Sequence, residues 1–75
     1  MFIFTNDIQS MRFCEDIVSI LRTQFHLSED VAKKYVAMQW EGQFFEGEYD
    51  MRYHELPLYW ANHIYKYHEY LFGDA

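Results

Sequence analysis

Hydrophobic and polar residues alternate with a helical period along most of the chain. From about Asp7 to Phe25 the apolar positions recur every three or four residues and fall on one half of a helical wheel. Thr5 or Asn6 can serve as the N-cap, and Asp7 adds a negative charge to the first turn, where the helix dipole favours it. The pattern predicts an amphipathic helix whose core-facing half consists of Met11, Phe13, Cys14, Ile17, Val18, Ile20, Leu21 and Phe25.

A second helix is indicated by a start signal at Ser28. Serine is a favoured N-cap, and Glu29 and Asp30 follow it in the first turn. We expect this helix to end near Trp40. The connection formed by residues 26–27 is short, which favours an antiparallel pair with the first helix.

Pro57 marks the start of a third helix, because its fixed φ suits a first turn. Gly73 supplies a C-terminal stop. One arc of this helix is apolar and is expected to face the core. Three residues fall on the opposite side, near Lys66, with no predicted partner within the domain: Tyr59, His63 and Tyr70.

Together these segments predict an all-α fold, with residues 1–75 forming a single domain of three helices around an aromatic-rich core. The connection between the second and third helices, from Glu41 to Leu56, is acidic and rich in aromatic residues. A structureless loop of this length is uncommon in a compact domain. The dipeptide at 46–47 suits a hairpin turn and the segment after Gly47 suits a helical turn; the sequence leaves both open.

The aromatic content exceeds what a small core can enclose. The chain has seven Phe, seven Tyr and two Trp in 75 residues. A domain of this size buries only about 60% of the surface that its unfolded chain exposes. Some aromatic surface should therefore remain outside, and exposed apolar patches commonly mark binding sites or oligomer contacts.

The net charge of −6 and the single cysteine narrow the possible partners and location. An acidic chain repels phosphate backbones and anionic lipid, so we expect neither nucleic acid nor membrane binding, and encounter with a basic protein is favoured. One cysteine allows no internal disulfide. No stretch approaches the ~20 apolar residues of a membrane span. These features predict a cytoplasmic protein.

Residues capable of catalysis or metal binding are present without the spacing that this chemistry requires. His63 and His68 are five residues apart, and His26 and His54 lie in connections, so no metal or cofactor is predicted. His68 falls within the apolar arc and is expected to be a core histidine bonded to a backbone carbonyl or a tyrosine. Cys14 shares the apolar face of its helix and is expected to be inert packing. The chain is therefore predicted not to be an enzyme.

The remaining hypothesis is a non-enzymatic protein-binding module, such as a small intracellular inhibitor or adaptor that engages a basic surface. Its candidate contacts alternate aromatic rings with acids in the connection: Phe44, Phe45, Glu46, Glu48, Tyr49 and Asp50. The two phenylalanines would instead serve the fold if they cap the open end of the core. The alternative function is a homo-oligomer, with a homodimer as the simplest form, assembled through Tyr59, His63 and Tyr70.

Overall fold

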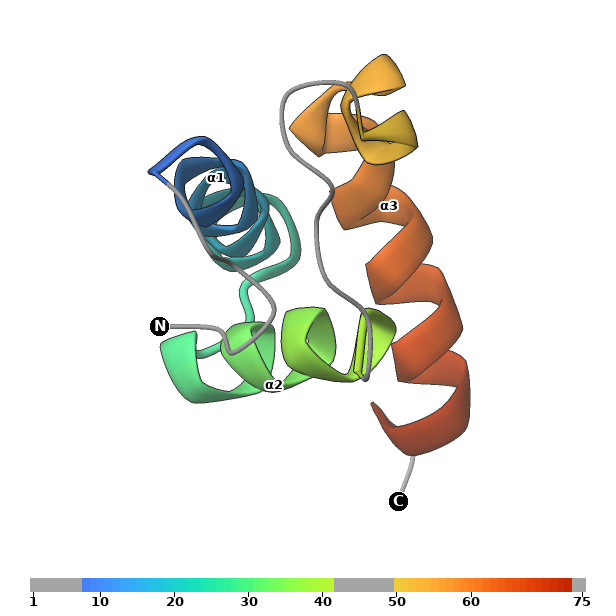
Figure 1. Ribbon diagram of the computed structural model, residues 1–75. Helices are drawn as coiled ribbons and strands as arrows, with labels where there is room; N and C mark the ends of the chain where they lie inside the picture. Colours follow the sequence, from blue (N-terminus) through green and yellow to red (C-terminus); the bar gives the residue numbers. More distant parts are fainter. Residues whose placement is uncertain (1–7, 42–49, 74–75) are drawn as a thin grey trace.

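The computed structural model describes residues 8–41 and 50–73 of the chain. Its elements are α1 (Ile8–Phe25), α2 (Glu29–Gln39), the short 3-10 helix η1 (Met51–His54), α3 (Pro57–His68) and the π-helical turn η2 (Glu69–Gly73). The described residues contain no strand. The prediction of an all-α domain with three helices is confirmed (Figure 1).

Ser28 and Pro57 begin α2 and α3, as the sequence predicted. Ser28 adopts an extended backbone and its side chain accepts a hydrogen bond from the Val31 N–H at 3.2 Å. Pro57 is the first residue of α3, and the preceding Leu56 caps the helix without a side-chain hydrogen bond. Helical structure continues to Gly73, but as a π-helical turn after His68.

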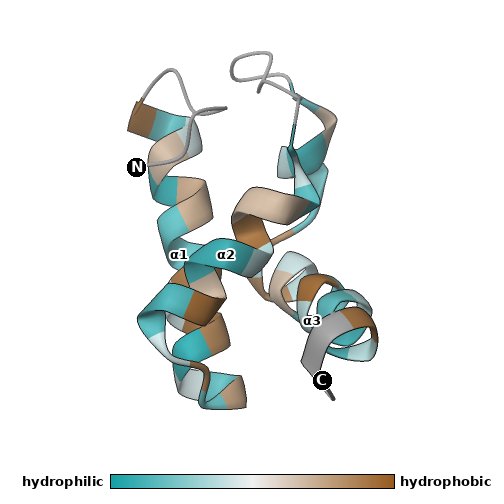
Figure 2. Cartoon of the chain, turned by 90° about the horizontal axis from the view of Figure 1, so that it is seen from below, coloured by the Kyte–Doolittle hydropathy of each residue, from teal (hydrophilic) through white to brown (hydrophobic). Residues whose placement is uncertain are grey.

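The connection between α1 and α2 sends the chain in a different direction from the one that the sequence suggested. His26 has a φ of 58°, in the left-handed region, and the Leu27 N–H donates to the Leu21 carbonyl at 3.4 Å. As a result α2 crosses α1 steeply (Figures 1 and 2), and the expectation of an antiparallel pair is wrong. The crossing carries α2 over to α3, so that all three helices contribute to one core.

The core follows the predicted apolar faces. Hydrophilic and hydrophobic positions alternate along the helices, as helices with one buried side require (Figure 2). The buried hydrophobic residues are Cys14, Ile17, Val18 and Leu21 from α1, Ala32, Tyr35, Val36 and Trp40 from α2 and its cap, and Ala61 and Ile64 from α3. Ser10, which lies at the edge of the apolar arc of α1, is also fully buried.

Candidate protein-binding surfaces

The described end of the connection forms a hydrogen-bonded junction. Asp50, grouped with the partner contacts by the sequence, is only 5% exposed. One carboxylate oxygen accepts the Arg52 N–H at 2.9 Å, capping η1, and the other pairs with the Arg52 guanidinium at 3.1 Å. This burial leaves Asp50 little surface for a partner. Within residues 50–54, the helical turn is the conformation that forms.

Arg52 links this junction to both neighbouring helices. Its guanidinium lies 5.5 Å from the centre of the Trp40 ring, an arrangement suited to a cation–π interaction. Its carbonyl accepts the Trp60 indole N–H at 2.8 Å. The two tryptophan rings themselves meet edge to face, with centroids 5.4 Å apart. The acid, the arginine and both indoles thus fix the N-terminal end of α3.

At the other end of α3, His68 is buried as predicted, but its partner differs from the expected carbonyl or tyrosine. Its Nε2 lies 3.1 Å from the Gln39 side-chain oxygen. Its ring stacks on Tyr35 at 5.5 Å and meets Tyr67 edge to face at 5.0 Å. Burial lowers the pKa of His68 below its usual 6.5, and the charge of nearby His63 acts in the same direction. A neutral imidazole therefore joins α2 to α3.

Tyr35 reinforces the same contact. Its hydroxyl donates to Glu69 Oε2 at 3.2 Å, which links α2 to the start of η2. Burial raises the pKa of Tyr35, and the hydrogen bond to Glu69 adds to that shift. The hydroxyl remains a donor at neutral pH.

Cys14 belongs to the hydrophobic core and is fully buried. Burial raises the pKa of its thiol to about 12, with a smaller opposing effect from the Arg52 charge. The reactive thiolate is therefore scarce at neutral pH. The prediction that this cysteine is buried packing is confirmed.

An open groove of about 450 Å³ separates the first turns of α1 from the η1–α3 junction. Ile8 and Leu56 line the groove while remaining 66% and 75% exposed. Phe13 and Tyr53 also line it, and their rings meet edge to face with centroids 4.9 Å apart. We call this the α1–α3 groove; its full lining is Ile8, Gln9, Arg12, Phe13, Asp16, Tyr53, Glu55, Leu56 and Pro57.

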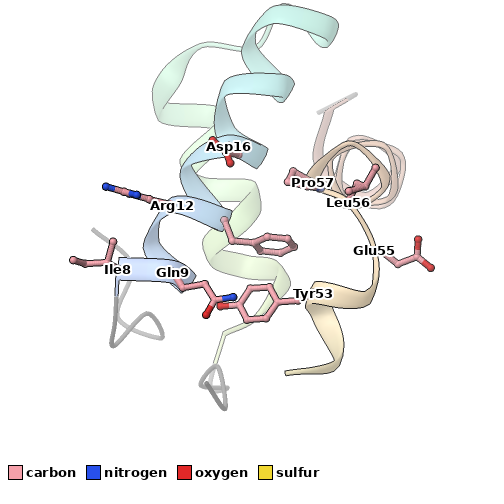
Figure 3. A pocket seen from close by; sticks show the side chains of 9 residues that line it. Ile8, Gln9, Arg12, Asp16, Tyr53, Glu55, Leu56 and Pro57 are labelled. Atoms are coloured by element: carbon pink, nitrogen blue, oxygen red, sulfur yellow. The ribbon is translucent and has the colours of Figure 1, made fainter. Parts of the chain in front are cut away.

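Two acidic residues and one basic residue are among those that line this groove. In the close-up view, Arg12 points away from the gap whereas Asp16 is turned toward it (Figure 3). Glu55 points outward from the α3 side. Gln9 and Tyr53 approach one another across the gap (Figure 3). The groove thus combines apolar walls with a slight excess of negative charge.

The sequence interpretation did not identify this groove. Ile8 lies outside the apolar half of its helix, and Leu56 directly precedes a proline at the first helical position. An apolar residue off the core face and an apolar residue in a capping position were the available signals. Neither signal indicates that the two residues would line the same groove.

The exposed side of α3 carries the other predicted contacts. Tyr59 is half exposed and its ring stacks parallel to the His63 ring, with centroids 6.4 Å apart. Tyr70, in η2, is 85% exposed. Lys66 is exposed between them. We call Tyr59, His63, Lys66 and Tyr70 the α3 stripe; Tyr67 in α3 and Leu71 in η2 are also about half exposed.

The other predicted contacts, Phe44, Phe45, Glu46, Glu48 and Tyr49, lie outside the described residues. Their role in binding stays a prediction. Within residues 8–41 and 50–73, no three or more His, Cys, Asp or Glu side chains are grouped so that they could hold a metal ion. In the same part of the chain, no helix has the length and apolarity needed to cross a bilayer.

Comparison of the chain with protein-family models, curated proteins and solved structures finds no match. The surfaces described above are therefore the basis on which function can be argued.

Proposed function

We propose that this protein is a non-enzymatic protein-binding module whose α1–α3 groove receives a basic, amphipathic segment of a partner protein. The observation that carries the proposal is the exposure of Ile8 and Leu56 on either side of an open groove. Large apolar side chains held at the rim of a concavity are typical of interaction sites. The aromatic pair of Phe13 and Tyr53 supplies a surface on which an apolar anchor can pack.

Charge supports a basic partner. Asp16 is turned toward the groove, Glu55 stands on its far side, and Arg12 points away. The whole chain carries a net charge of −6, which attracts a basic partner over several ångströms before contact. The apolar walls would then retain a segment that the acids have steered into place.

The lining also argues for binding rather than catalysis. The described residues around the groove include two carboxylates but no serine, threonine, cysteine or histidine that could act as a nucleophile or its base. Cys14 and His68 are both buried away from solvent. An inhibitor or adaptor, which acts by occupying a partner's surface, needs none of these groups.

The test uses two neighbouring leucines as a matched pair. Leu56 lines the groove and Leu58 does not, although both are at least half exposed and flank the same proline. A leucine–lysine amphipathic helical peptide serves as the probe and a leucine–glutamate peptide as its charge-reversed control. Binding is followed by NMR shift changes of the ¹⁵N-labelled protein.

We expect the basic peptide to perturb residues of α1 and η1 around the groove, and Leu56→Glu to weaken its binding by about tenfold or more, a loss typical of an apolar anchor. Leu58→Glu should bind as the wild type does. Added salt should slow association of the basic peptide. Equal losses in both variants, or equal binding of both peptides, would exclude the groove as the proposed site.

A further inference from the structure

We infer that the α3 stripe pairs in antiparallel fashion with the same stripe of a second copy of this chain. This surface is separate from the α1–α3 groove, so the inference stands independently of the proposed function. Its starting observation is that the exposed aromatic side of α3 has no covering element among the described residues: Tyr59 and Tyr67 are half exposed and Tyr70 is 85% exposed.

The sequence separations between successive members of the α3 stripe are the same when counted from either end. Its members are separated by four, three and four residues, with a tyrosine at each end. Tyr59 and Tyr70 are eleven positions apart, about three turns of α-helix, and only the last two of these positions belong to the wider π-helical turn η2, so both tyrosines lie on one side. A two-fold axis across the middle of the stripe therefore sets Tyr59 of one copy against Tyr70 of the other.

The distribution of charge favours a second copy of this chain as the molecule that packs against the α3 stripe. A chain with a charge of −6 repels itself over most of its surface, yet α3 contains no acid from Pro57 to His68. Lys66 is the one formal charge of the stripe. Pairing through this side therefore keeps the acids of both copies at the margins of the interface.

The available area indicates a weak dimer rather than an obligate one. Two copies of the exposed aromatic side offer on the order of 1,000 Å² to bury, near the lower limit for specific interfaces. The parallel stacking of Tyr59 on His63 holds one end of the stripe in place before contact. Such a dimer should form at micromolar concentrations and dissociate on dilution.

Sedimentation equilibrium of the full chain across a concentration series tests association. We expect the mass to rise from the 9.3 kDa monomer toward twice that value. Replacing both end tyrosines, Tyr59→Ser with Tyr70→Ser, should raise the dissociation constant at least about tenfold. Leu58→Ser, an exposed apolar change on the same helix outside the stripe, should leave it unchanged.

Register is tested by mixing two single variants, Tyr59→Cys and Tyr70→Cys, under mild oxidation. An antiparallel pair should yield mainly a disulfide joining one variant to the other, since Cys14 is fully buried and does not compete. Disulfides within each variant alone would contradict the antiparallel register.

A mass that stays monomeric to high micromolar concentration would overturn the dimer. Added salt separates this surface from the groove, because it should weaken peptide binding but not self-association.

Discussion

The two ends of α3 are anchored to the rest of the molecule by different chemistry. Near its start, Trp60 donates to the Arg52 carbonyl, and Arg52 is held by the buried carboxylate of Asp50. Near its end, a neutral His68 faces Gln39. A charged anchor weakens when one partner loses its charge, because the opposite charge stays buried with less compensation. A neutral anchor fails when it gains a proton. The same helix therefore has two distinct weaknesses.

Removing the charge of Asp50 should produce the largest loss of stability. Asp50→Asn removes the carboxylate charge that pairs with the Arg52 guanidinium at 3.1 Å, and the Arg52 side chain is largely buried. Breaking a buried ion pair from one side costs about 3 kcal/mol of unfolding free energy. Urea unfolding followed by circular dichroism measures the loss.

An exposed ion pair provides the control for that experiment. Glu29 pairs with Lys33 at 2.7 Å, but both side chains are half exposed. Because solvent screens such pairs, Glu29→Gln should leave the unfolding free energy unchanged within error. Equal effects of the two substitutions would show that the junction is not a charged anchor.

The anchor at His68 should weaken as the solution becomes acidic. Burial places the pKa of His68 below 6.5 in the folded protein, so the unfolded chain takes up the proton first. The unfolding free energy should be full above pH 6.5 and should fall as the pH decreases toward the folded-state pKa, by at most about 1.4 kcal/mol per pH unit for one proton. Urea unfolding at a series of pH values measures this slope.

Two substitutions test whether the pH dependence of the unfolding free energy arises from the His68 imidazole. His68→Gln retains a polar side chain that can face Gln39 but does not titrate, so the pH dependence below 6.5 should flatten. His54→Gln, at an exposed position of η1, should leave the slope in place. A wild-type slope in the His68→Gln protein would assign the titration to another group.

The smallest effect is expected at Tyr35. Tyr35→Phe keeps the ring that stacks on His68 and removes the hydroxyl that donates to Glu69. A single hydrogen bond of this kind contributes about 1 kcal/mol or less. Thermal unfolding should detect this decrease, whereas Tyr67→Phe, at a half-exposed position, should have no effect. A drop as large as that of Asp50→Asn would remove the distinction between the two ends.

The elements that local signals control could be predicted from the sequence. Ser28 and Pro57 begin helices because their effects act on the backbone within one turn. The burial of Cys14 and His68 follows from helical periodicity, which records how each helix faces the core. In these cases the information lies within a few residues of the feature that it predicts.

Features that join distant segments could not be predicted in the same way. Asp50 looked like a surface acid because nothing near it shows that Arg52 would lie against Trp40, the cap of another helix. The groove likewise depends on the fold placing Ile8 and Leu56 in the lining of the same open groove. The steep crossing of α1 and α2 accompanies a positive backbone angle φ at His26 that no neighbouring residue indicates.

That angle has a consequence for how freely the sequence can vary. His26 is exposed, so packing places almost no demand on its side chain. Its left-handed backbone nevertheless costs any residue with a Cβ on the order of 1 kcal/mol, and costs β-branched residues most. Glycine and asparagine fit this position, while valine and isoleucine do not. Backbone conformation, rather than solvent exposure, thus determines which residues position 26 tolerates. Exposure alone would predict that any residue fits there.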